Sequence, residues 1–310
     1  MAEIIDDKSP VVIPFILSHL AKHREKQPNK PFFIGLNGVQ GAGKTVLVTE
    51  LKRTLASKGL KPAVFSLDDL YLTHADQLEL GKANPSNPLL QHRGQPSTHD
   101  IALALSIFED LSHNRPTKIP QYNKALFSGK GDRLPEAEWE SITEPVDIVL
   151  FEGWCVGFQP LQVDELTRKH ASAASAAAND QYSYTGRLGH NTEESVTTIN
   201  TALDQYSRLW SYFDVFVHID AADPLFVYKW RLQQEATTRR VRGGGMTDDE
   251  VTHFVDGYFP AYELYTETLR NGIFKPNNRV AGGSGTADWK GRQLRLIVDE
   301  NRRVKEAITI

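Results

Sequence analysis

The residues with the clearest chemical potential form a glycine-rich segment near the N-terminus. Residues 38–45 match the pattern G-x-x-x-x-G-K-[ST]. Glycines allow successive backbone N–H groups to face one anion, because no Cβ obstructs the approach. A helix that begins here would add the positive end of its dipole. The segment therefore predicts a P-loop that binds a nucleoside triphosphate through Gly38, Val39, Gln40, Gly41, Ala42, Gly43, Lys44 and Thr45.

Three polar side chains fit the chemistry of a nucleotide bound at this loop. Lys44 can reach the β- and γ-phosphates, and the Thr45 hydroxyl can ligate Mg²⁺. Glu152 follows the apolar run 148–151 and occupies the Walker B position, where an acid holds Mg²⁺ directly or through water. The alternative for Glu152 is a strand-end acid that caps a neighbouring helix.

Two adjacent acids, Asp68 and Asp69, follow another predicted strand at 62–67. In an open α/β sheet, ligands bind beyond the carboxyl ends of the strands, so both acids are expected near the P-loop. Phosphoryl transfer to a hydroxyl needs a carboxylate that accepts or orients the proton of the attacking oxygen. One aspartate could do this while its neighbour contacts metal or caps the next helix. These residues alone leave the choice between them open.

The hydrophobic pattern predicts the elements that must position these groups. Helices are expected at 11–26 and 45–57. Continuous apolar runs predict strands, the last of them at 294–298; the others lie at 31–36, 62–67, 146–151 and 215–219. Such runs between helices are typical of a parallel sheet covered on both faces. The expected fold class is α/β: a P-loop NTPase-type, mostly parallel sheet in a three-layer α/β/α arrangement, with a lid segment.

The chain is predicted to form one domain over residues 1–310, with an N-terminal helix within 1–30. Residues 171–191 are rich in Ala, Ser, Asn and Gly, and we expect a flexible insertion over 165–195. The alanine run within it could form a short helix. A second flexible loop is expected at 280–286, which contains several glycines.

Residues 231–247 have the composition of a lid. A basic helix end precedes Gly243, Gly244 and Gly245, so the segment supplies positive charge for a γ-phosphate and glycines for hinges. The alternative is a basic helix end that satisfies its own dipole and stops at a glycine cap. Some arginines of this segment could contact phosphate while others satisfy the helix dipole. Arg231, inside the helix, is the arginine predicted to contact phosphate.

Composition excludes several other classes of protein. The net charge of −4 does not favour a broad nucleic-acid-binding surface. A single cysteine, Cys155, allows neither an intramolecular disulfide nor a cysteine-based metal cluster. The N-terminal ten residues are acidic rather than basic, and no apolar run reaches the roughly 18 residues of a membrane span. We expect a soluble, cytoplasmic monomer with no nucleic-acid or membrane partner.

Several longer motifs carry a family resemblance. Residues 65–71, Phe-Ser-Leu-Asp-Asp-Leu-Tyr, resemble the S-x-D-x-F-Y segment of the uridine kinase, phosphoribulokinase and pantothenate kinase group of P-loop kinases. Within this group the chain is most similar to D-glycerate 3-kinase and its fungal relatives. The similarity covers most of the chain and extends through residues 87–94, 99–100, 120–124, 131–133, 151–154, 230–233, 245–250 and 258–262. Leu70 and Asn123 depart from the Phe and Asp of many members.

The resemblance implies roles for individual residues. Asp68 stands at the position of the catalytic base and so ranks above Asp69. The segment that closes over the phosphates in the family corresponds to 231–242. The residues implied to line the acceptor pocket are Arg93, His99, Asp100, Tyr122 and Lys124. Beside what the resemblance implies, we expect Asp69 to contact the acceptor, and Lys44 and Arg231 to take part in catalysis.

The physical chemistry of two of these side chains bears on the acceptor. Arg93 could clamp a carboxylate through two parallel hydrogen bonds, although a solvated loop arginine is an equal alternative. For His99, the alternative to a ligand contact is a surface or capping histidine. The prediction is an ATP- and Mg²⁺-dependent kinase that phosphorylates a hydroxyl of a small hydroxy acid, D-glycerate, to give 3-phosphoglycerate. Alternatives are a kinase of a nucleoside or pantothenate-like metabolite, and a P-loop NTPase that acts as a regulatory binding module.

Overall fold

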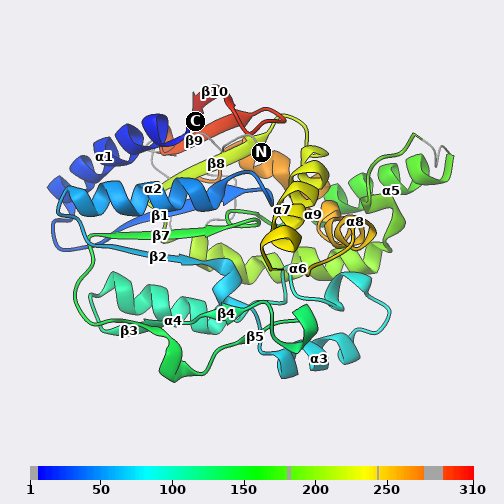
Figure 1. Cartoon of the computed structure of the whole chain (residues 1–310). Coiled ribbons are helices and arrows are strands. Elements are labelled where there is room, and N and C mark those ends of the chain that lie inside the picture. The colour runs from blue at the N-terminus through cyan, green and yellow to red at the C-terminus, as the bar shows by residue number, and fades with distance from the viewer. Residues whose placement is uncertain (1–5, 180–182, 243, 276–288) are drawn as a thin grey trace.

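The central sheet positions the other elements of the chain. A computed structural model describes the chain except for residues 1–5, 180–182, 243 and 276–288. The strands of the sheet are β1 (Phe32–Gly38), β2 (Pro62–Ser66), β7 (Ile148–Gly153), β8 (Val215–Ala221), β9 (Gln293–Val298) and β10 (Val304–Thr309). They lie in the order β10-β9-β8-β1-β7-β2 (Figure 1). All neighbouring pairs are parallel except β9 and β10. The mostly parallel sheet predicted from the apolar runs is confirmed.

The sequence pattern of each strand reflects its position in the sheet. Strands β1 and β8 are buried along their whole length, which explains their continuous apolar runs. The prediction that the run at 294–298 is the last strand was wrong, because β10 follows it. This edge strand is mostly half-buried or exposed, and its sequence, Val-Lys-Glu-Ala-Ile-Thr, includes two charged residues. It therefore lacks the apolar run used to recognise the buried strands.

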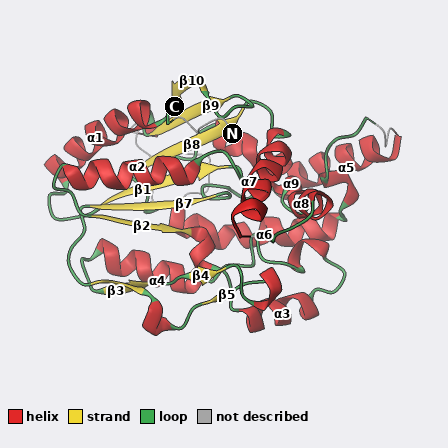
Figure 2. Cartoon of the chain, viewed as in Figure 1, coloured by secondary structure: helices red, strands yellow, loops and turns green. Residues whose placement is uncertain are grey.

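Helices cover both faces of the sheet (Figures 1 and 2). Helices α1 (Ser9–Lys26) and α2 (Lys44–Ser57) lie over one face, and α4 (Ile101–Ser112) and α6 (Glu193–Trp210) lie over the other (Figure 1). The remaining helices are α3 (His74–Ala83), α5 (Val163–Asn179), α7 (Phe226–Arg242), α8 (Asp248–Asp256) and α9 (Phe259–Arg270). Two short antiparallel pairs stand apart from the main sheet: β3 (Thr117–Ile119) with β6 (Glu140–Ile142), and β4 (Tyr122–Asn123) with β5 (Asp132–Arg133).

Aromatic side chains fill the core between the sheet and the α4–α6 layer. The rings of Phe108 and Phe151 meet edge to face at 5.1 Å, and Trp210 stacks on Phe213 at 5.6 Å. A Cβ at Gly35 of β1 would lie 2.5 Å from the Phe213 ring, so only glycine allows this close approach. Burial of each such aromatic side chain contributes roughly 1.5–3 kcal/mol to the free energy of unfolding.

Much of the predicted insertion at 165–195 has regular structure. Helix α5 occupies its first half, in keeping with the high helix propensity of alanine. Beyond residue 182, Arg187 forms an ion pair of 2.6 Å with Asp256, and its backbone N–H donates to Glu263 at 2.8 Å. These contacts tie the segment to α8 and α9. Its flexibility stays a prediction, and the loop expected at 280–286 lies outside the described residues.

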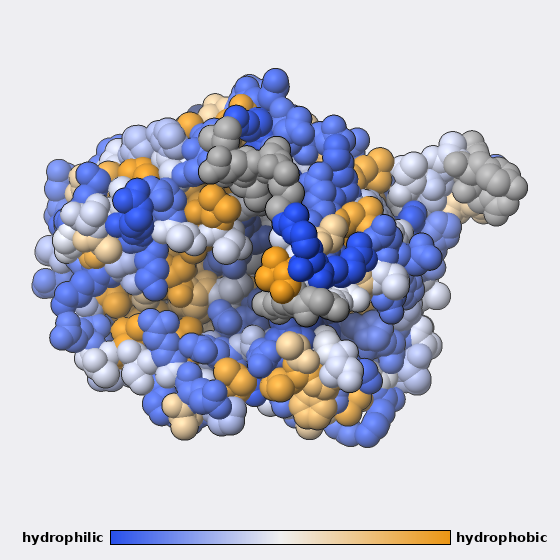
Figure 3. Space-filling model, viewed as in Figure 1, coloured by the Kyte–Doolittle hydropathy of each residue, from blue (hydrophilic) through white to orange (hydrophobic). Residues whose placement is uncertain are grey.

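The surface has few large hydrophobic side chains. Figure 3 shows one face of the molecule, mostly hydrophilic with small, separate hydrophobic areas. Among the described residues, the exposed large hydrophobic side chains are those of Leu78, Leu126, Phe127, Val163 and Val241. Within the same part of the chain, no helix has both the length and the apolar character that crossing a membrane requires.

Candidate active site

The P-loop connects the end of β1 to the start of α2. Gly41 and Gly43 adopt φ angles of +80° and +96°, a region that side chains with a Cβ rarely enter. Gly43 lies directly before the first residue of α2, so the positive end of the helix dipole faces the loop. Thr45 is the second residue of α2 and is exposed. The geometry matches an anion-binding loop, as the motif predicts.

Lys44 folds back over the loop that precedes it. Its Nζ donates a hydrogen bond of 2.7 Å to the carbonyl oxygen of Gly38. Burial lowers the pKa of Lys44, while the nearby carboxylates of Glu152 and Asp68 act in the opposite direction. The ammonium group therefore contacts the P-loop and interacts electrostatically with Glu152, near the end of β7, and with Asp68, after β2.

Residues from the second half of the chain support the P-loop. A Cβ at Gly41 would lie 2.6 Å from the Cβ of Trp230 in α7. Arg302, in the turn between β9 and β10, donates from Nε to the carbonyl oxygen of Gly41 at 2.6 Å. Its guanidinium also lies 5.3 Å from the centre of the Trp230 ring and donates to Gln233 at 2.9 Å. Sequence reasoning missed Arg302 because it lies far from the motif in sequence and belongs to none.

Strand register brings the acids to the P-loop. Glu152 pairs with Leu36 of β1 on one side and with Ser66 of β2 on the other. Strand β2 ends at Ser66, and the chain continues directly into a 3₁₀ helix, η1 (Leu67–Leu70), which contains Asp68 and Asp69. Parallel strands that end at one edge therefore gather all three acids predicted from the sequence.

The two aspartates have different environments. Asp69 forms a capping box with Ser66, whose backbone N–H donates to Oδ2 at 3.0 Å. Burial raises the pKa of Asp69 to about 6, opposed by this hydrogen bond and reinforced by the charge of Asp68. Asp68 is 27% exposed and forms an ion pair with Lys124. Burial raises the pKa of Asp68, but the charge and hydrogen bond of Lys124, with a contribution from the charge of Lys44, outweigh this effect, and the pKa falls to about 2.

Glu152 has one unsatisfied oxygen. Its Oε2 atom is buried and accepts no hydrogen bond from any described residue, so this oxygen caps none of the described helices. Burial raises the pKa of Glu152, and the charge of Lys44 partly offsets this effect. A buried carboxylate oxygen without a partner is costly unless a cation or an ordered water contacts it. The capping alternative for this atom is therefore wrong.

Lys124 lies on a loop between β4 and β5 that Arg93 supports. The Arg93 Nη1 atom donates to the carbonyl oxygens of Gly129, at 2.8 Å, and Lys130. Its guanidinium lies 5.6 Å from the centre of the Tyr122 ring. Arg93 thus stabilises this loop rather than extending into solvent. Its contact with a carboxylate stays a prediction.

His99 and Tyr122 meet at the ring of Tyr71. His99 stacks on Tyr71 at 4.5 Å, and Tyr122 meets the same ring edge to face at 5.2 Å. Asp100 instead caps α4, where it accepts from the Leu103 N–H at 3.0 Å; it also pairs with Arg133 at 3.0 Å. Both of its carboxylate oxygens have partners within the protein, so Asp100 has a clear structural role. Its predicted acceptor contact remains untested.

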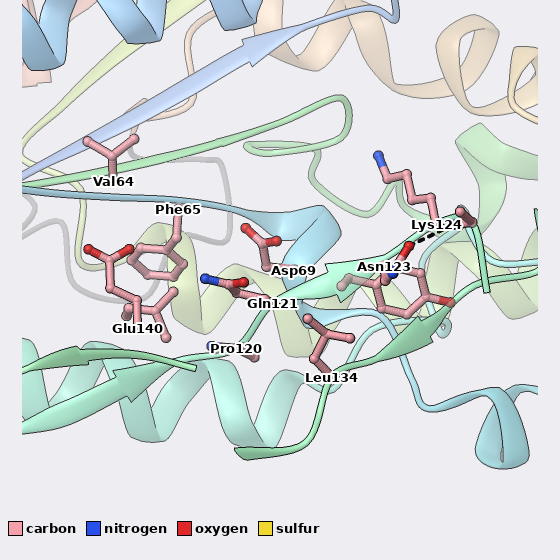
Figure 4. Close-up of a pocket in the computed structure, with 12 residues that line it drawn as sticks. Val64, Phe65, Asp69, Pro120, Gln121, Asn123, Lys124, Leu134 and Glu140 are labelled. Atoms are coloured by element: carbon pink, nitrogen blue, oxygen red, sulfur yellow. Dashed lines mark hydrogen bonds between the residues drawn. The ribbon is translucent and has the colours of Figure 1, made fainter. Parts of the chain in front are cut away.

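A pocket of about 600 Å³ opens beside η1 along the edge of β2. Lys124 lies at one end and Glu140 at the other, with Asp69 and Gln121 between them (Figure 4). Polar and apolar residues both line the pocket, which is wide enough for a small metabolite. Of the predicted acceptor-binding residues, it brings together Asp69, Tyr122 and Lys124.

The predicted lid, 231–247, comprises most of α7 and the connection from α7 to α8. Arg231 donates from Nη1 to Gln234 at 2.6 Å, and its guanidinium lies 5.3 Å from the Phe254 ring. Glu235 of α7 accepts a hydrogen bond of 2.9 Å from the N–H of Met246, which precedes α8. This bond links the α7–α8 connection to α7. Arg231 directly follows Trp230, the P-loop contact, but its side chain packs against α8. The phosphate contact predicted for it would need a different side-chain rotamer.

Comparison with known proteins agrees with this geometry, although no family model matches the chain. The uncharacterized kinase mug58 of Schizosaccharomyces pombe is 37% identical over 94% of this chain and 97% of its own length. The chloroplastic D-glycerate 3-kinase of Arabidopsis thaliana is 36% identical over 93% of this chain, which spans 57% of that protein. The solved structure of D-glycerate 3-kinase from Cryptococcus neoformans has a TM-score of 0.84 and 34% identity, covering 99% of this chain and 100% of that one. The chain belongs to the D-glycerate 3-kinase family.

Membership of the D-glycerate 3-kinase family confirms the resemblance read from the motifs. The chain is an ATP-dependent kinase of a small metabolite, built on the P-loop kinase fold. The roles of individual side chains remain predictions.

The contact between Arg302 and the P-loop leads to a prediction about nucleotide binding. In Arg302→Ala the Gly41 carbonyl loses a charged donor, which typically contributes roughly 1.5–3 kcal/mol. We expect the Kd for ATP, measured by calorimetry, to rise about tenfold or more. Arg303→Ala is the matched control, since the Arg303 guanidinium lies 3.9 Å from Asp7 instead. An unchanged Kd in Arg302→Ala would show that this contact does not support the loop.

Proposed function

We propose that the chain transfers the γ-phosphoryl group of ATP to a hydroxyl of D-glycerate and so forms 3-phosphoglycerate. The observation that carries the proposal is the position of Asp68, which interacts electrostatically with Lys44 of the P-loop and forms an ion pair with Lys124 of the neighbouring pocket. A carboxylate between Lys44 of the phosphate site and a lysine at the end of the neighbouring pocket suits transfer to a hydroxyl of an acid. Relatives named D-glycerate 3-kinase support this acceptor.

In this proposal the P-loop holds the triphosphate. The backbone N–H groups of residues 38–45 surround the phosphates, and Lys44 moves from the Gly38 carbonyl to the β- and γ-phosphates. Arg231 in the lid neutralises the charge that develops on the transferred group. Its Nε is buried and forms no hydrogen bond with a described residue, so a change of rotamer toward the phosphates would break no hydrogen bond at this atom.

Thr45 and Glu152 are the residues we propose for Mg²⁺. The fit is supported by the buried Oε2 atom of Glu152, which has no partner, and by the exposed position of Thr45 at the start of α2. Within the described residues there is no cluster of three or more His, Cys, Asp or Glu side chains arranged for a metal. A site of one carboxylate and one hydroxyl suits Mg²⁺, which retains waters and takes phosphate oxygens as its other ligands. The bound ion would offset negative charge on those phosphates.

Asp68 is the proposed catalytic base. Its pKa of about 2 keeps the carboxylate ionised at neutral pH, so it can accept a hydrogen bond from the attacking hydroxyl and orient it. A strongly basic group is not needed, since phosphoryl transfer passes through a loose transition state that depends mainly on positioning and charge. Asp69 is less suited to the role, because its carboxylate caps its own turn through the Ser66 N–H and burial raises its pKa to about 6, so it is less fully ionised than Asp68 at neutral pH.

Lys124 is the proposed partner of the acceptor carboxylate. Its ammonium contacts Asp68 and lies at the end of the pocket, so an acid bound there would share this cation with the base. Arg93, Tyr122, His99 and Asp69 are the other proposed acceptor contacts. Arg93 would also act indirectly, by holding the loop that carries Lys124.

The proposed acceptor is tested with purified protein, ATP and Mg²⁺ against D-glycerate, L-glycerate, glycerol, uridine and pantothenate. We expect ADP release to depend on D-glycerate, with the product identified as 3-phosphoglycerate by phosphorus NMR. Phosphorylation of uridine or pantothenate instead of D-glycerate would show that the acceptor is that metabolite. ADP release that needs no acceptor would favour a regulatory NTPase.

The role of Asp68 predicts a selective loss of turnover. In Asp68→Asn the side chain keeps its shape but no longer takes the proton or carries the charge, so kcat should fall by about 10²-fold or more. The Kd for ATP should change less than about threefold. Asp147→Asn is the control, since Asp147 directly precedes β7 at the opposite end of the strand and pairs with Arg24. Equal losses of turnover and ATP binding would contradict the role.

The ion pair between Asp68 and Lys124 predicts a shift in the pH profile. In Lys124→Met the lysine no longer opposes the effect of burial, so the pKa of Asp68 should rise from about 2. Because the ionised carboxylate is the active form, the acid limb of kcat should move to higher pH, and KM for D-glycerate should rise about tenfold or more. Lys130→Met, on the same loop, is the control. An unchanged acid limb would mean that Lys124 does not control this carboxyl.

A further inference from the structure

A buried histidine and a buried tyrosine form a hydrogen-bonded pair behind the acceptor side of the site. His99 and Tyr206, the latter in α6, are only 4% and 1% exposed. The Tyr206 hydroxyl lies 2.7 Å from Nδ1 of His99, and the two rings meet edge to face. The same hydroxyl also accepts a hydrogen bond of 3.2 Å from the Ser97 N–H.

These contacts determine which nitrogen of His99 carries the proton. A tyrosine hydroxyl has a single hydrogen to donate. Because Tyr206 already accepts from Ser97, its own hydrogen is satisfied when Nδ1 of His99 accepts it. In the other tautomer, Nδ1–H would point at the hydroxyl oxygen and leave the Tyr206 hydrogen without an acceptor among these groups. The network thus favours a neutral ring with its hydrogen on Nε2.

The state of the ring agrees with this assignment. Burial lowers the pKa of His99 to about 3, and the charge of Asp68 acts in the opposite direction. The imidazole is therefore neutral at physiological pH and carries one hydrogen. That hydrogen is on Nε2 if Tyr206 donates to Nδ1.

The Nε2 atom of His99 has no partner within the protein. It is buried, and none of the described residues forms a hydrogen bond with it. A buried donor without an acceptor is unfavourable, so such a group in a folded protein calls for an explanation. The ring stacks on Tyr71, which directly follows η1, and the backbones of His99 and Tyr71 form an isolated β-bridge. His99 therefore lies beside the turn that carries the proposed base.

We propose that Tyr206 is a positioning residue that holds His99 in the Nε2–H tautomer, so that His99 donates a hydrogen bond to an oxygen of the bound acceptor. This inference rests on the proposed function, since it names a further determinant of acceptor binding at the same site. The oxygen concerned is not the attacking one. A donor on the attacking oxygen would withdraw the electron pair needed for bond formation, whereas a donor on a carboxylate or neighbouring hydroxyl orients the molecule.

The tautomer is measured directly by NMR on protein labelled with ¹⁵N-histidine. Two-bond correlations distinguish Nε2–H from Nδ1–H, and His99→Ala assigns the signal. We expect a neutral Nε2–H ring in wild type and a changed or mixed state in Tyr206→Phe, which removes the hydroxyl but keeps the ring. An Nδ1–H tautomer in wild type would overturn the inference. This readout needs no substrate, so it can fail or succeed independently of the proposed acceptor.

Kinetics then test whether Tyr206 acts through His99. Tyr206→Phe should raise KM for D-glycerate about fivefold, as expected for the loss of one neutral hydrogen bond, and leave KM for ATP unchanged. Tyr265→Phe is the matched control, because the Tyr265 hydroxyl is also buried but has no hydrogen-bond partner. Thermal unfolding of each variant reports on stability separately from binding.

A double-mutant cycle separates positioning from simple packing. In a His99→Ala background, adding Tyr206→Phe should leave KM for the acceptor unchanged, since the group that Tyr206 orients is already absent. An equal rise in KM with and without His99 would overturn the proposal, because the tyrosine would then act through the fold. If wild type does not phosphorylate D-glycerate, the proposed function fails, and the cycle is run with the acceptor that the panel identifies.

Discussion

The parallel pairing of β2, β7 and β1 is the constraint on which the site depends. Because parallel strands that start together also end together, the P-loop after β1, Glu152 near the end of β7 and Asp68 after β2 meet at one edge of the sheet. A slip of β7 by one residue would turn Glu152 to the other face of the sheet. The buried aromatic core fixes this register, so catalytic geometry and core packing are linked.

Charges of both signs gather at this edge before any ligand binds. Lys44 and Lys124 oppose Asp68 and Glu152, and the resulting fields act on the pKa values of Lys44, Asp68 and Glu152. In the proposed mechanism, triphosphate engages Lys44 and the acceptor carboxylate engages Lys124. Each ligand would therefore change the charge around Asp68, which lies between the proposed phosphate site and the proposed acceptor site.

Local patterns in the sequence predicted the parts of the molecule that depend on local physics. The P-loop follows from glycines in a fixed spacing, and the buried strands follow from apolar runs. Contacts distant in sequence could not be predicted: Arg302 on Gly41 and Tyr206 on His99 depend on the folded sheet. The resemblance identified His99, but its Tyr206 partner required the structure. Edge strand β10 was missed because it lacks a continuous apolar run.

The proposed mechanism requires Asp68 to lie between the γ-phosphate and the acceptor hydroxyl. A crystal structure with a non-hydrolysable ATP analogue, Mg²⁺ and D-glycerate tests it most directly. We expect the 3-hydroxyl oxygen within hydrogen-bond distance of the Asp68 carboxylate and in line with the γ-phosphate, with the acceptor carboxylate at Lys124. A D-glycerate bound elsewhere, or a hydroxyl directed away from Asp68, would contradict the account.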